Sequence, residues 1–148
     1  MATVRIDRQD PLDARWGDEL ARVLAAQGRP PGWSERLLDD LCERLKGRYG
    51  AYLRASGEDG ALLGAALLLS RREAGESEAR PWLAALWVHP EVRGRGLGRK
   101  LAQSAERYAR EHGGGEMVAT APPEDDATLY MLERWGFSRE RVALSKSL

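Results

Sequence analysis

The chain has few of the residues that form disulfides or bind metals. Its 148 residues include one cysteine and two histidines. A single cysteine excludes an internal disulfide, and Cys42, His89 and His112 do not have the spacing of a zinc site. Cys42 lies on the apolar stripe of an expected helix, which indicates a packing residue rather than a reactive thiol. We therefore expect no bound metal.

The sequence also lacks an excess of charge and a long apolar run. Its 23 basic and 23 acidic residues give a formal net charge of zero, which argues against a main task of holding nucleic acid or an anionic membrane. No stretch approaches the roughly 18 apolar residues of a membrane span, and residues 1–10 already carry charges, unlike a signal peptide. The expectation is a cytoplasmic globular protein in which residues 1–148 form a single domain.

What the sequence does contain is a series of short apolar segments separated by turn residues. The expected strands lie at residues 4–6, 51–55, 62–70, 83–88, 117–120 and around Val142 and Leu144. The expected helices begin at Asp13, at Ser34, at Leu97 and at Asp125 or Asp126. Residues 51–70 predict a hairpin whose second strand is apolar on both faces, as in the middle of a sheet. The charged residues 71–80 are expected to form an exposed turn.

The segment from Leu83 to Glu111 predicts a strand, a sharp loop and a helix. The apolar run of the strand ends at Val88, and His89 and Pro90 break it. From Leu97 onward, apolar residues recur with the spacing of a helix that has one buried stripe. The loop and the first helical turn alternate glycine with arginine, in Arg93, Gly94, Arg95, Gly96, Gly98 and Arg99.

Glycines and arginines at the start of a helix favour the binding of an anion. The glycines can take positive φ and let a ligand approach the backbone. The first amides of the helix have no partner inside it, and the positive end of the helix dipole lies there. The arginines add positive charge, so a pyrophosphate is the natural ligand. The loop has neither the Gly-Lys-Ser/Thr of a P-loop nor the glycine spacing of a dinucleotide-binding fold.

This loop resembles the acyl-CoA loop of the GNAT superfamily of N-acetyltransferases. The family pattern Arg/Gln-x-x-Gly-x-Gly/Ala is met by Arg93, Gly96 and Gly98. Residues 125–137 are similar to the second motif of the family, a helix that ends in Gly-Phe, here Gly136-Phe137. The resemblance implies an α/β (α+β) fold in a single domain. Its central sheet would be mixed but mostly antiparallel, parallel only around the cofactor, and flanked by about four helices.

The resemblance also implies a reaction and a co-substrate. In the family an amine attacks the thioester carbonyl of acetyl-CoA while both substrates are bound, so an acetyl-CoA-dependent N-acetyltransferase is expected. Backbone groups of the residues matching Leu86, Trp87 and Val88 would hold the pantetheine, and that of Val88 would polarise the thioester oxygen. The other expected cofactor-binding residues are Arg93, Gly94, Arg95, Gly96, Leu97, Gly98, Arg99 and Asp125, the last standing where the family often has asparagine.

The sequence departs from the family at the expected proton donor. Leu132 occupies the position where the family usually has a tyrosine that protonates the departing CoA thiolate. Leucine cannot donate a proton, and Tyr130 lies about 200° away around the helix. No general base is identifiable, since the central strand has no carboxylate and His89 stands where the family often has a histidine without a proton-transfer role. The acids nearest in sequence to the expected cleft are Glu78, Glu124, Asp125 and Asp126. The alternative is therefore a non-catalytic acyl-CoA-binding regulatory or interaction module.

The acceptor stays open at this point. A small-molecule or a peptide amine fits the expected chemistry, and the connector Arg29–Trp33 corresponds to the segment that borders the acceptor site in the family. Tryptophans line an apolar amine pocket or pack in the core, and the five are Trp16, Trp33, Trp82, Trp87 and Trp135. Many relatives pair, so a homodimer is also an open option.

Overall fold

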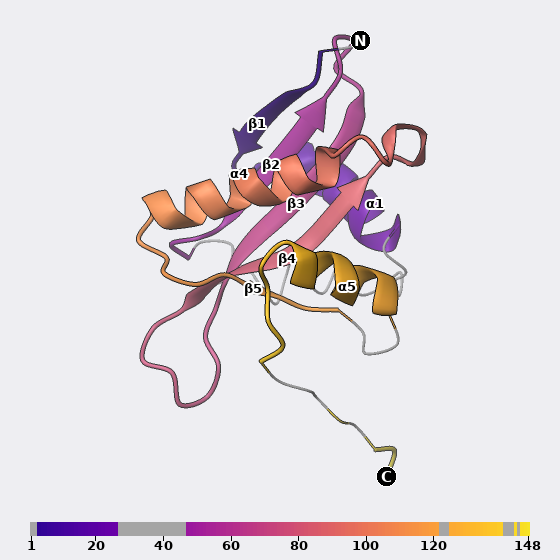
Figure 1. Cartoon of the computed structure of the whole chain (residues 1–148). Helices are drawn as coiled ribbons and strands as arrows, with labels where there is room; N and C mark the ends of the chain where they lie inside the picture. The colour runs from indigo at the N-terminus through magenta and orange to yellow at the C-terminus, as the bar shows by residue number, and fades with distance from the viewer. Residues whose placement is uncertain (1–2, 27–46, 122–124, 141–143, 145) are drawn as a thin grey trace. The chain divides into compact units, whose positions relative to one another are not determined.

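The computed structural model describes residues 3–26, 47–121, 125–140, 144 and 146–148 (Figure 1). The chain divides into two compact units, Met1–Val118 and Ala119–Leu148. The first unit contains nearly all of a five-stranded sheet and the helices packed on it, and the second contains one described helix. That residues 1–148 form a single domain stays a prediction.

The sheet has the strand order β1-β2-β3-β4-β5. Its strands are β1 (Arg5–Gln9), β2 (Ala51–Ser56), β3 (Leu62–Arg71), β4 (Arg80–Val88) and β5 (Val118–Ala119). β1 pairs with β2, β2 with β3 and β3 with β4, and each of these pairs is antiparallel. The mostly antiparallel sheet expected from the sequence is therefore confirmed.

Three α-helices lie within the described part of the chain: α1 (Gly17–Ala26), α4 (Leu97–Glu111) and α5 (Asp126–Arg134). Short 3-10 turns, η1 (Ala14–Trp16) and η2 (Pro90–Val92), precede α1 and α4. The helix expected from Ser34 lies outside the described residues, as do Cys42 and the connector Arg29–Trp33. In the described ranges, no helix combines the length and the apolar character needed to span a membrane.

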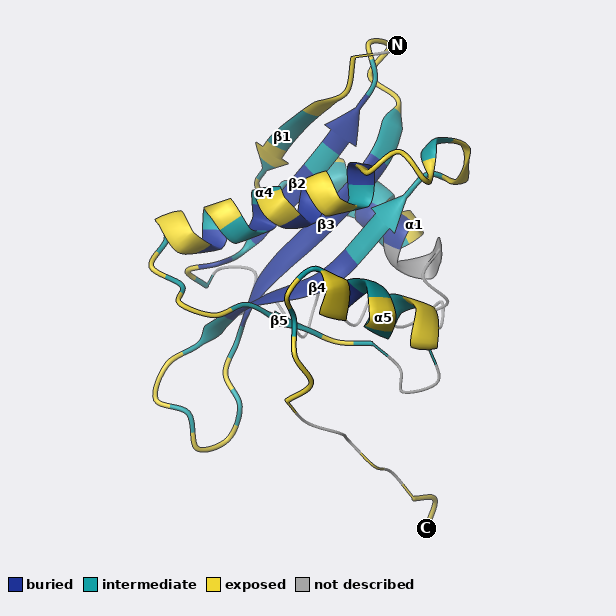
Figure 2. Cartoon of the chain, viewed as in Figure 1, coloured by how far each residue is buried: buried dark blue, intermediate teal, exposed yellow. Residues whose placement is uncertain are grey.

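The two faces of the sheet carry separate parts of the hydrophobic core. Figure 2 shows the buried stretches of the strands in dark blue. Because side chains alternate along a strand, Tyr52, Ala65 and Leu67 share one face, where they pack with Leu20 and Val23 of α1. The opposite face is covered by α4, which contacts β2, β3 and β4. The buried stripe of α4 consists of Leu97, Leu101, Ala102, Ala105 and Ala109. β3 is buried on both faces along most of its length, as its apolar run predicted.

A β-bulge lies in the middle of β4. The pairing with β3 skips Ala84, because its neighbours Leu83 and Ala85 pair with consecutive residues of β3. An extra residue in a strand shifts the alternation of the side chains that follow it. Trp82 and Trp87 therefore both pack with the cluster on the α1 face. Strict alternation would have placed these two side chains on opposite faces.

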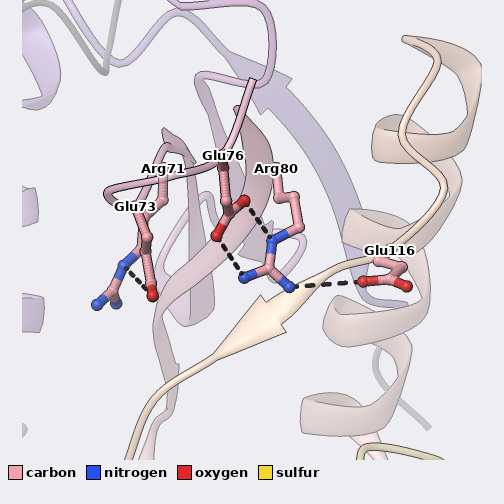
Figure 3. A network of polar contacts seen from close by, with 5 residues as sticks. All are labelled: Arg71, Glu73, Glu76, Arg80 and Glu116. Carbon is pink, nitrogen blue, oxygen red and sulfur yellow. Dashed lines mark hydrogen bonds and ion pairs between the residues drawn. The ribbon is translucent and has the colours of Figure 1, made fainter. Parts of the chain in front are cut away.

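Ion pairs hold the connection between β3 and β4 (Figure 3). Arg71 and Arg80 pair directly across the two strands, which brings like charges together. Arg80 lies between Glu76, at 3.0 Å, and Glu116, at 3.5 Å, and Arg71 contacts Glu73 at 3.4 Å. The side chains of Glu73, Arg80 and Glu76 are only 18%, 20% and 22% exposed. The predicted turn is exposed at Arg72, Ala74, Gly75, Ser77 and Glu78, whereas Glu73, Glu76 and Arg80 are half-buried, contrary to the prediction.

The second unit is built around α5. Asp125 caps this helix, because its Oδ1 accepts a hydrogen bond from the Thr128 N–H at 3.1 Å and its Oδ2 accepts one from the Thr128 hydroxyl at 2.7 Å. At the other end Gly136 has φ +98°, and the Phe137 N–H donates to the Leu132 carbonyl at 3.0 Å. This is a Schellman closure, and it explains the Gly-Phe pair that the sequence motif contains.

The last strand expected from the sequence is not confirmed. Leu144 belongs to no strand and is 92% exposed. Val142 lies outside the described residues. Alternation of two apolar residues over so short a segment is a weak strand signal, because a strand is stabilised by its partners in the sheet.

Candidate functional site

The end of β4 is followed by the short turn η2. Pairing with β3 continues to the last residue of β4, and the next N–H, that of His89, donates to the Leu63 carbonyl at 2.8 Å. His89 then caps η2, because its Nδ1 accepts a hydrogen bond from the Glu91 N–H at 3.1 Å. Pro90 begins this turn and has no N–H that needs a partner. His89 therefore has a structural role at the strand end.

Arg93 joins the loop back to the strand. Its Nε donates to the Val88 carbonyl at 2.9 Å, and the side chain is exposed. The remaining guanidinium N–H groups of Arg93 are available to a ligand. A thioester oxygen is polarised by N–H donors, so this use of the Val88 carbonyl leaves the role predicted for the N–H groups of the strand unchanged.

Two glycines of the loop have a left-handed backbone. Gly94 and Gly96 both have φ +80°, and a Cβ added at either would meet no heavy atom within 4 Å. Gly96 is the N-cap of α4, and its carbonyl accepts the helical hydrogen bond from the Lys100 N–H at 3.1 Å. The amides of α4 that come before Lys100, in the first turn, have no partner within the helix. Gly98 already lies inside α4 and does not have positive φ, which corrects the expectation for that glycine.

The loop is positively charged on its outer side. Arg93, Arg95 and Arg99 are all exposed. Within the residues that the structure describes, no ion pair involves Arg95 or Arg99. Open backbone at two glycines, the amides of the helix start and exposed guanidinium groups together suit an anion with several charged oxygens, such as a diphosphate.

Leu97 anchors the start of α4 to the sheet. Its side chain is 7% exposed, so it can reach a ligand only through its backbone. Gly64 of β3 permits this close packing, because a Cβ there would lie 2.9 Å from Leu101 Cδ1, 3.0 Å from the Trp87 carbonyl oxygen and 3.3 Å from Leu97 Cδ2. Gly64 thus sets the spacing between β4 and the helix start. The sequence reasoning missed this residue, although a glycine inside an apolar strand signals a close approach.

Much of the outer edge of β4 has no strand beside it in the described structure. The strand order places β5 next to β4. β5 has two residues and β4 has nine, so β5 can pair with only part of that edge. An open strand edge can bind an extended ligand through backbone hydrogen bonds. This arrangement is compatible with the contacts expected from Trp87 and Val88, whereas Leu86 already has an interaction within the described structure.

The end of β4 also carries two aromatic side chains. The rings of Trp87 and His89 have centroids 5.8 Å apart and planes at 72°, an edge-to-face contact. Both residues are half-buried. The sequence predicts only backbone contacts for this stretch, and it leaves the side chain of Trp87 open between an apolar amine pocket and core packing.

Three of the four acids nearest in sequence to the expected cleft lie in the described part of the chain. The carboxylate of Asp125 accepts hydrogen bonds from the hydroxyl and the N–H of Thr128. These bonds, first of all that from the hydroxyl, lower the pKa of Asp125 below its ordinary value. Asp126 is exposed in the first turn of α5. Glu78 lines an open depression of about 480 Å³ beside the start of β4, at the opposite end of that strand from the loop. Glu124 lies outside the described residues.

One carboxylate lies on the α1 face of the sheet. Glu19 Oε1 accepts hydrogen bonds from the Tyr52 hydroxyl at 2.5 Å and from Arg54 Nε at 2.8 Å. Burial, followed by the hydrogen bond to Glu19, raises the pKa of Tyr52 well above its ordinary value. These contacts tie α1 to β2.

Leu132 and Tyr130 lie on different sides of α5. Leu132 is 7% exposed and Tyr130 is 66% exposed. This confirms the prediction from helix geometry that Tyr130 points away from the position of Leu132. Leu132 is a packing residue of the second unit.

Comparison with known proteins identifies the family. The model of the Acetyltransferase (GNAT) family matches residues 17–137, which include the strand, loop and helix described above. The chain belongs to the GNAT family of acetyltransferases. This GNAT chain is also 38% identical over 66 residues to the acetyltransferase plu1384 of Photorhabdus laumondii subsp. laumondii. That match covers 43% of this chain and 46% of the relative, so it spans about half of each.

Solved structures resemble this GNAT chain over nearly its whole length. The aminoglycoside N-acetyltransferase AAC(6')-Iy in complex with CoA has a TM-score of 0.74 and 21% identity, over 99% of this chain and 96% of that one. The ribosomal-protein-alanine N-acetyltransferase from Brucella melitensis biovar Abortus 2308 has a TM-score of 0.68 and 22% identity, over 99% and 100%. At these identities the likeness concerns the fold, and it confirms the GNAT-like fold expected from the sequence.

Proposed function

We propose that this GNAT chain is an acetyl-CoA-dependent N-acetyltransferase that moves the acetyl group to a primary amine. The observation that carries the proposal is the open loop in which Gly94 and Gly96 take left-handed conformations directly between the end of β4 and the first amides of α4. The diphosphate of acetyl-CoA has the charge and the acceptor oxygens that such a loop binds. Membership of the family and the presence of CoA in a similar structure support the same ligand.

The loop and the strand are proposed to bind different parts of the coenzyme. The first amides of α4 and the arginines would bind the diphosphate, and the open edge of β4 would bind the extended pantetheine. The residues proposed for these contacts are Leu86, Trp87, Val88, Arg93, Gly94, Arg95, Gly96, Leu97, Gly98 and Arg99. Asp125, which caps α5 in the second unit, stays a predicted contact.

The transfer makes one bond and breaks one. The amine nitrogen attacks the thioester carbonyl, the C–N bond forms, the C–S bond breaks, an amine proton passes to solvent and the sulfur takes up a proton. A thiol with a pKa of about 8.5 is a tolerable leaving group near neutrality. An amine with a pKa of about 10.4 costs about 4.6 kcal/mol to deprotonate at pH 7. Removal of the amine proton is the larger demand, so Leu132 does not prevent transfer.

The acceptor is proposed to be a primary amine of a small molecule or of a peptide. Of the similar proteins, one is named for aminoglycosides and one for alanine of a ribosomal protein, so the GNAT fold serves both kinds of acceptor. A cytoplasmic location and a homodimer stay predictions.

A non-catalytic acyl-CoA-binding regulatory or interaction module is the second candidate. The buried Leu132 favours it, because leucine cannot protonate the leaving thiolate. A module of this kind would bind acetyl-CoA through the same loop and release no thiol beyond slow hydrolysis.

Calorimetric titration with acetyl-CoA, followed by an amine and peptide screen for free thiol, separates these readings. We expect binding by the wild type and much weaker binding by Gly96→Asp, because a carboxylate beside the diphosphate repels it. The absence of acetyl-CoA binding would end the coenzyme assignment, and binding of ATP instead would indicate a different phosphate ligand. Binding without acceptor-dependent thiol release would favour the non-catalytic module.

A further inference from the structure

The open depression at the start of β4 lies away from the proposed coenzyme site. Its volume of about 480 Å³ is in the range of sites that bind small organic ligands. Its lining residues fall within residues 47–49 and 70–79, all of them in the first unit. The nine residues of β4 span about 26 Å at about 3.3 Å per residue. A small ligand in the depression would therefore not reach the loop at the other end of the strand.

Two buried residues give the depression a fixed wall. Tyr49 is 4% exposed and Ser70 is 8% exposed. The Tyr49 N–H donates to Ser70 Oγ at 3.0 Å, which joins the segment before β2 to the end of β3. The hydroxyl of Ser70 can also donate one hydrogen bond, and no acceptor for it lies within the described residues. A ligand that brings an acceptor oxygen would give this buried donor a partner.

Three charged side chains line the same depression, Arg48, Arg72 and Glu78, and all three are exposed. The ion pairs of Arg71 and Arg80 described above hold the connection from which Arg72 and Glu78 project (Figure 3). Unlike these neighbours, the side chains of Arg72 and Glu78 form no ion pair or hydrogen bond with any described residue. Their charges are therefore available to a ligand.

Arg48 is positioned by two neighbours. Its guanidinium carbon lies 5.8 Å from the ring centroid of Tyr49. Gly113, which follows α4, leaves room for the guanidinium, because a Cβ there would lie 2.8 Å from Arg48 Nη2. An arginine whose position is set before binding loses less conformational freedom when it binds a carboxylate.

We infer that this depression binds a free α-amino acid, at a site separate from the machinery of the proposed function. Arg48, Arg72 and the Ser70 hydroxyl would bind the carboxylate, and Glu78 would bind the ammonium group. A ligand with only negative charge would be repelled by Glu78, and one with only positive charge would be repelled by two arginines. A ligand that carries both charges gives each sign a partner.

Calorimetric titration of the full chain with three probes that share one carbon skeleton tests this site. L-leucine carries both charged groups, 4-methylpentanoate lacks the ammonium group and 3-methylbutylamine lacks the carboxylate. Arg72→Ala removes a guanidinium, and Glu78→Gln removes a negative charge at nearly constant size. Arg107→Ala and Glu58→Gln are the matched controls, because both residues are exposed and neither lines the depression.

We expect the wild type to bind L-leucine at least about fivefold more tightly than either of the other probes. Arg72→Ala and Glu78→Gln should each weaken the binding of L-leucine about 5- to 50-fold, because each removes one charge-assisted contact. The two control variants should bind L-leucine as the wild type does. Acetyl-CoA affinity should be the same in the wild type and in all four variants.

Three results would overturn the inference. The first is a wild type that does not bind L-leucine, and the second is one that binds 4-methylpentanoate or 3-methylbutylamine as tightly as L-leucine. The third is L-leucine binding that neither Arg72→Ala nor Glu78→Gln weakens, since the amino acid would then lie at another site. The comparison of the three probes in the wild type requires no variant to fold. A wild type that binds L-leucine but not acetyl-CoA would overturn the proposed function and support this site.

Discussion

Gly96→Ala separates the backbone conformation of the loop from its charge. Gly96 has φ +80° and is the N-cap of α4. A left-handed backbone costs an L-residue about 1–2 kcal/mol relative to glycine. An added Cβ would meet no protein atom within 4 Å, so the cost in the free protein is conformational and not steric.

The conformational cost of alanine at this position can lower either the stability of the folded chain or its affinity for acetyl-CoA. A loop that keeps its left-handed conformation after the substitution lowers the free energy of unfolding by about 1–2 kcal/mol. A loop that relaxes in the free protein must be restored by the ligand, and affinity for acetyl-CoA then falls about 5- to 30-fold. The new methyl group also enters the open space where the diphosphate is proposed to lie. We therefore expect the affinity to fall at least about fivefold.

Gly75 provides a matched control. It has φ +88°, a Cβ added there would meet nothing within 4 Å, and it lies in the connection before the start of β4, at the far end of that strand from the loop. Gly75→Ala should therefore lower the free energy of unfolding by a similar amount and leave acetyl-CoA affinity unchanged. Calorimetric titration and urea unfolding of the wild type and the two variants measure both quantities.

One result would refute this reasoning about the loop. If Gly96→Ala bound acetyl-CoA as tightly as the wild type and lost only the stability lost by Gly75→Ala, the left-handed backbone of the loop would have no part in binding. The coenzyme would then have to lie elsewhere, and the proposed function would lose the observation on which it depends.

Two further predictions concern the packing of α4 on the sheet and the hydrogen bond between α1 and β2. Gly64→Ala places a Cβ 2.9 Å from Leu101 Cδ1 and 3.0 Å from the Trp87 carbonyl oxygen, so it should cost about 1–3 kcal/mol in urea unfolding. The start of α4 must move, so acetyl-CoA affinity should fall as well, and an unchanged affinity would contradict the role given to Gly64. Tyr52→Phe removes the hydrogen bond to the Glu19 carboxylate and should cost about 1.5–3 kcal/mol at pH 7. Because burial raises the pKa of Tyr52 in the folded chain, this tyrosine contributes full stability below its unfolded pKa of about 10 and loses it as the pH rises further. Urea unfolding from about pH 7 to pH 11 should show this loss in the wild type, and its persistence in Tyr52→Phe would exclude Tyr52 as the cause.

Local sequence patterns were sufficient for the elements around the loop. The helix begins at Leu97 as predicted, and Gly94 and Gly96 take positive φ. Asp125 caps α5, and Gly136 ends it. Each of these outcomes depends on a side chain, or the lack of one, acting on backbone within a few residues. Such effects can be recognised in a sequence without knowledge of the partners in space.

Predictions that depended on distant partners were incomplete. The connection at residues 71–80 appeared exposed because its composition is charged, yet Glu116, from beyond α4, helps to neutralise Arg80. Leu144 alternates with Val142 but belongs to no strand. The composition of a segment shows which interactions its side chains can make, whereas the burial of the segment depends on which other segments fold against it.

Amino-acid order alone therefore established the strand, the glycine loop, the following helix and the family resemblance, because these features follow from interactions between near neighbours in the chain. Only folding in three dimensions placed Trp82 and Trp87 on one face of β4, seated the start of α4 against Gly64 and paired Glu19 with Arg54. These features depend on strand register and on contacts between residues far apart in the chain. A single extra residue in one strand changes which side chains meet, and no local pattern records that change.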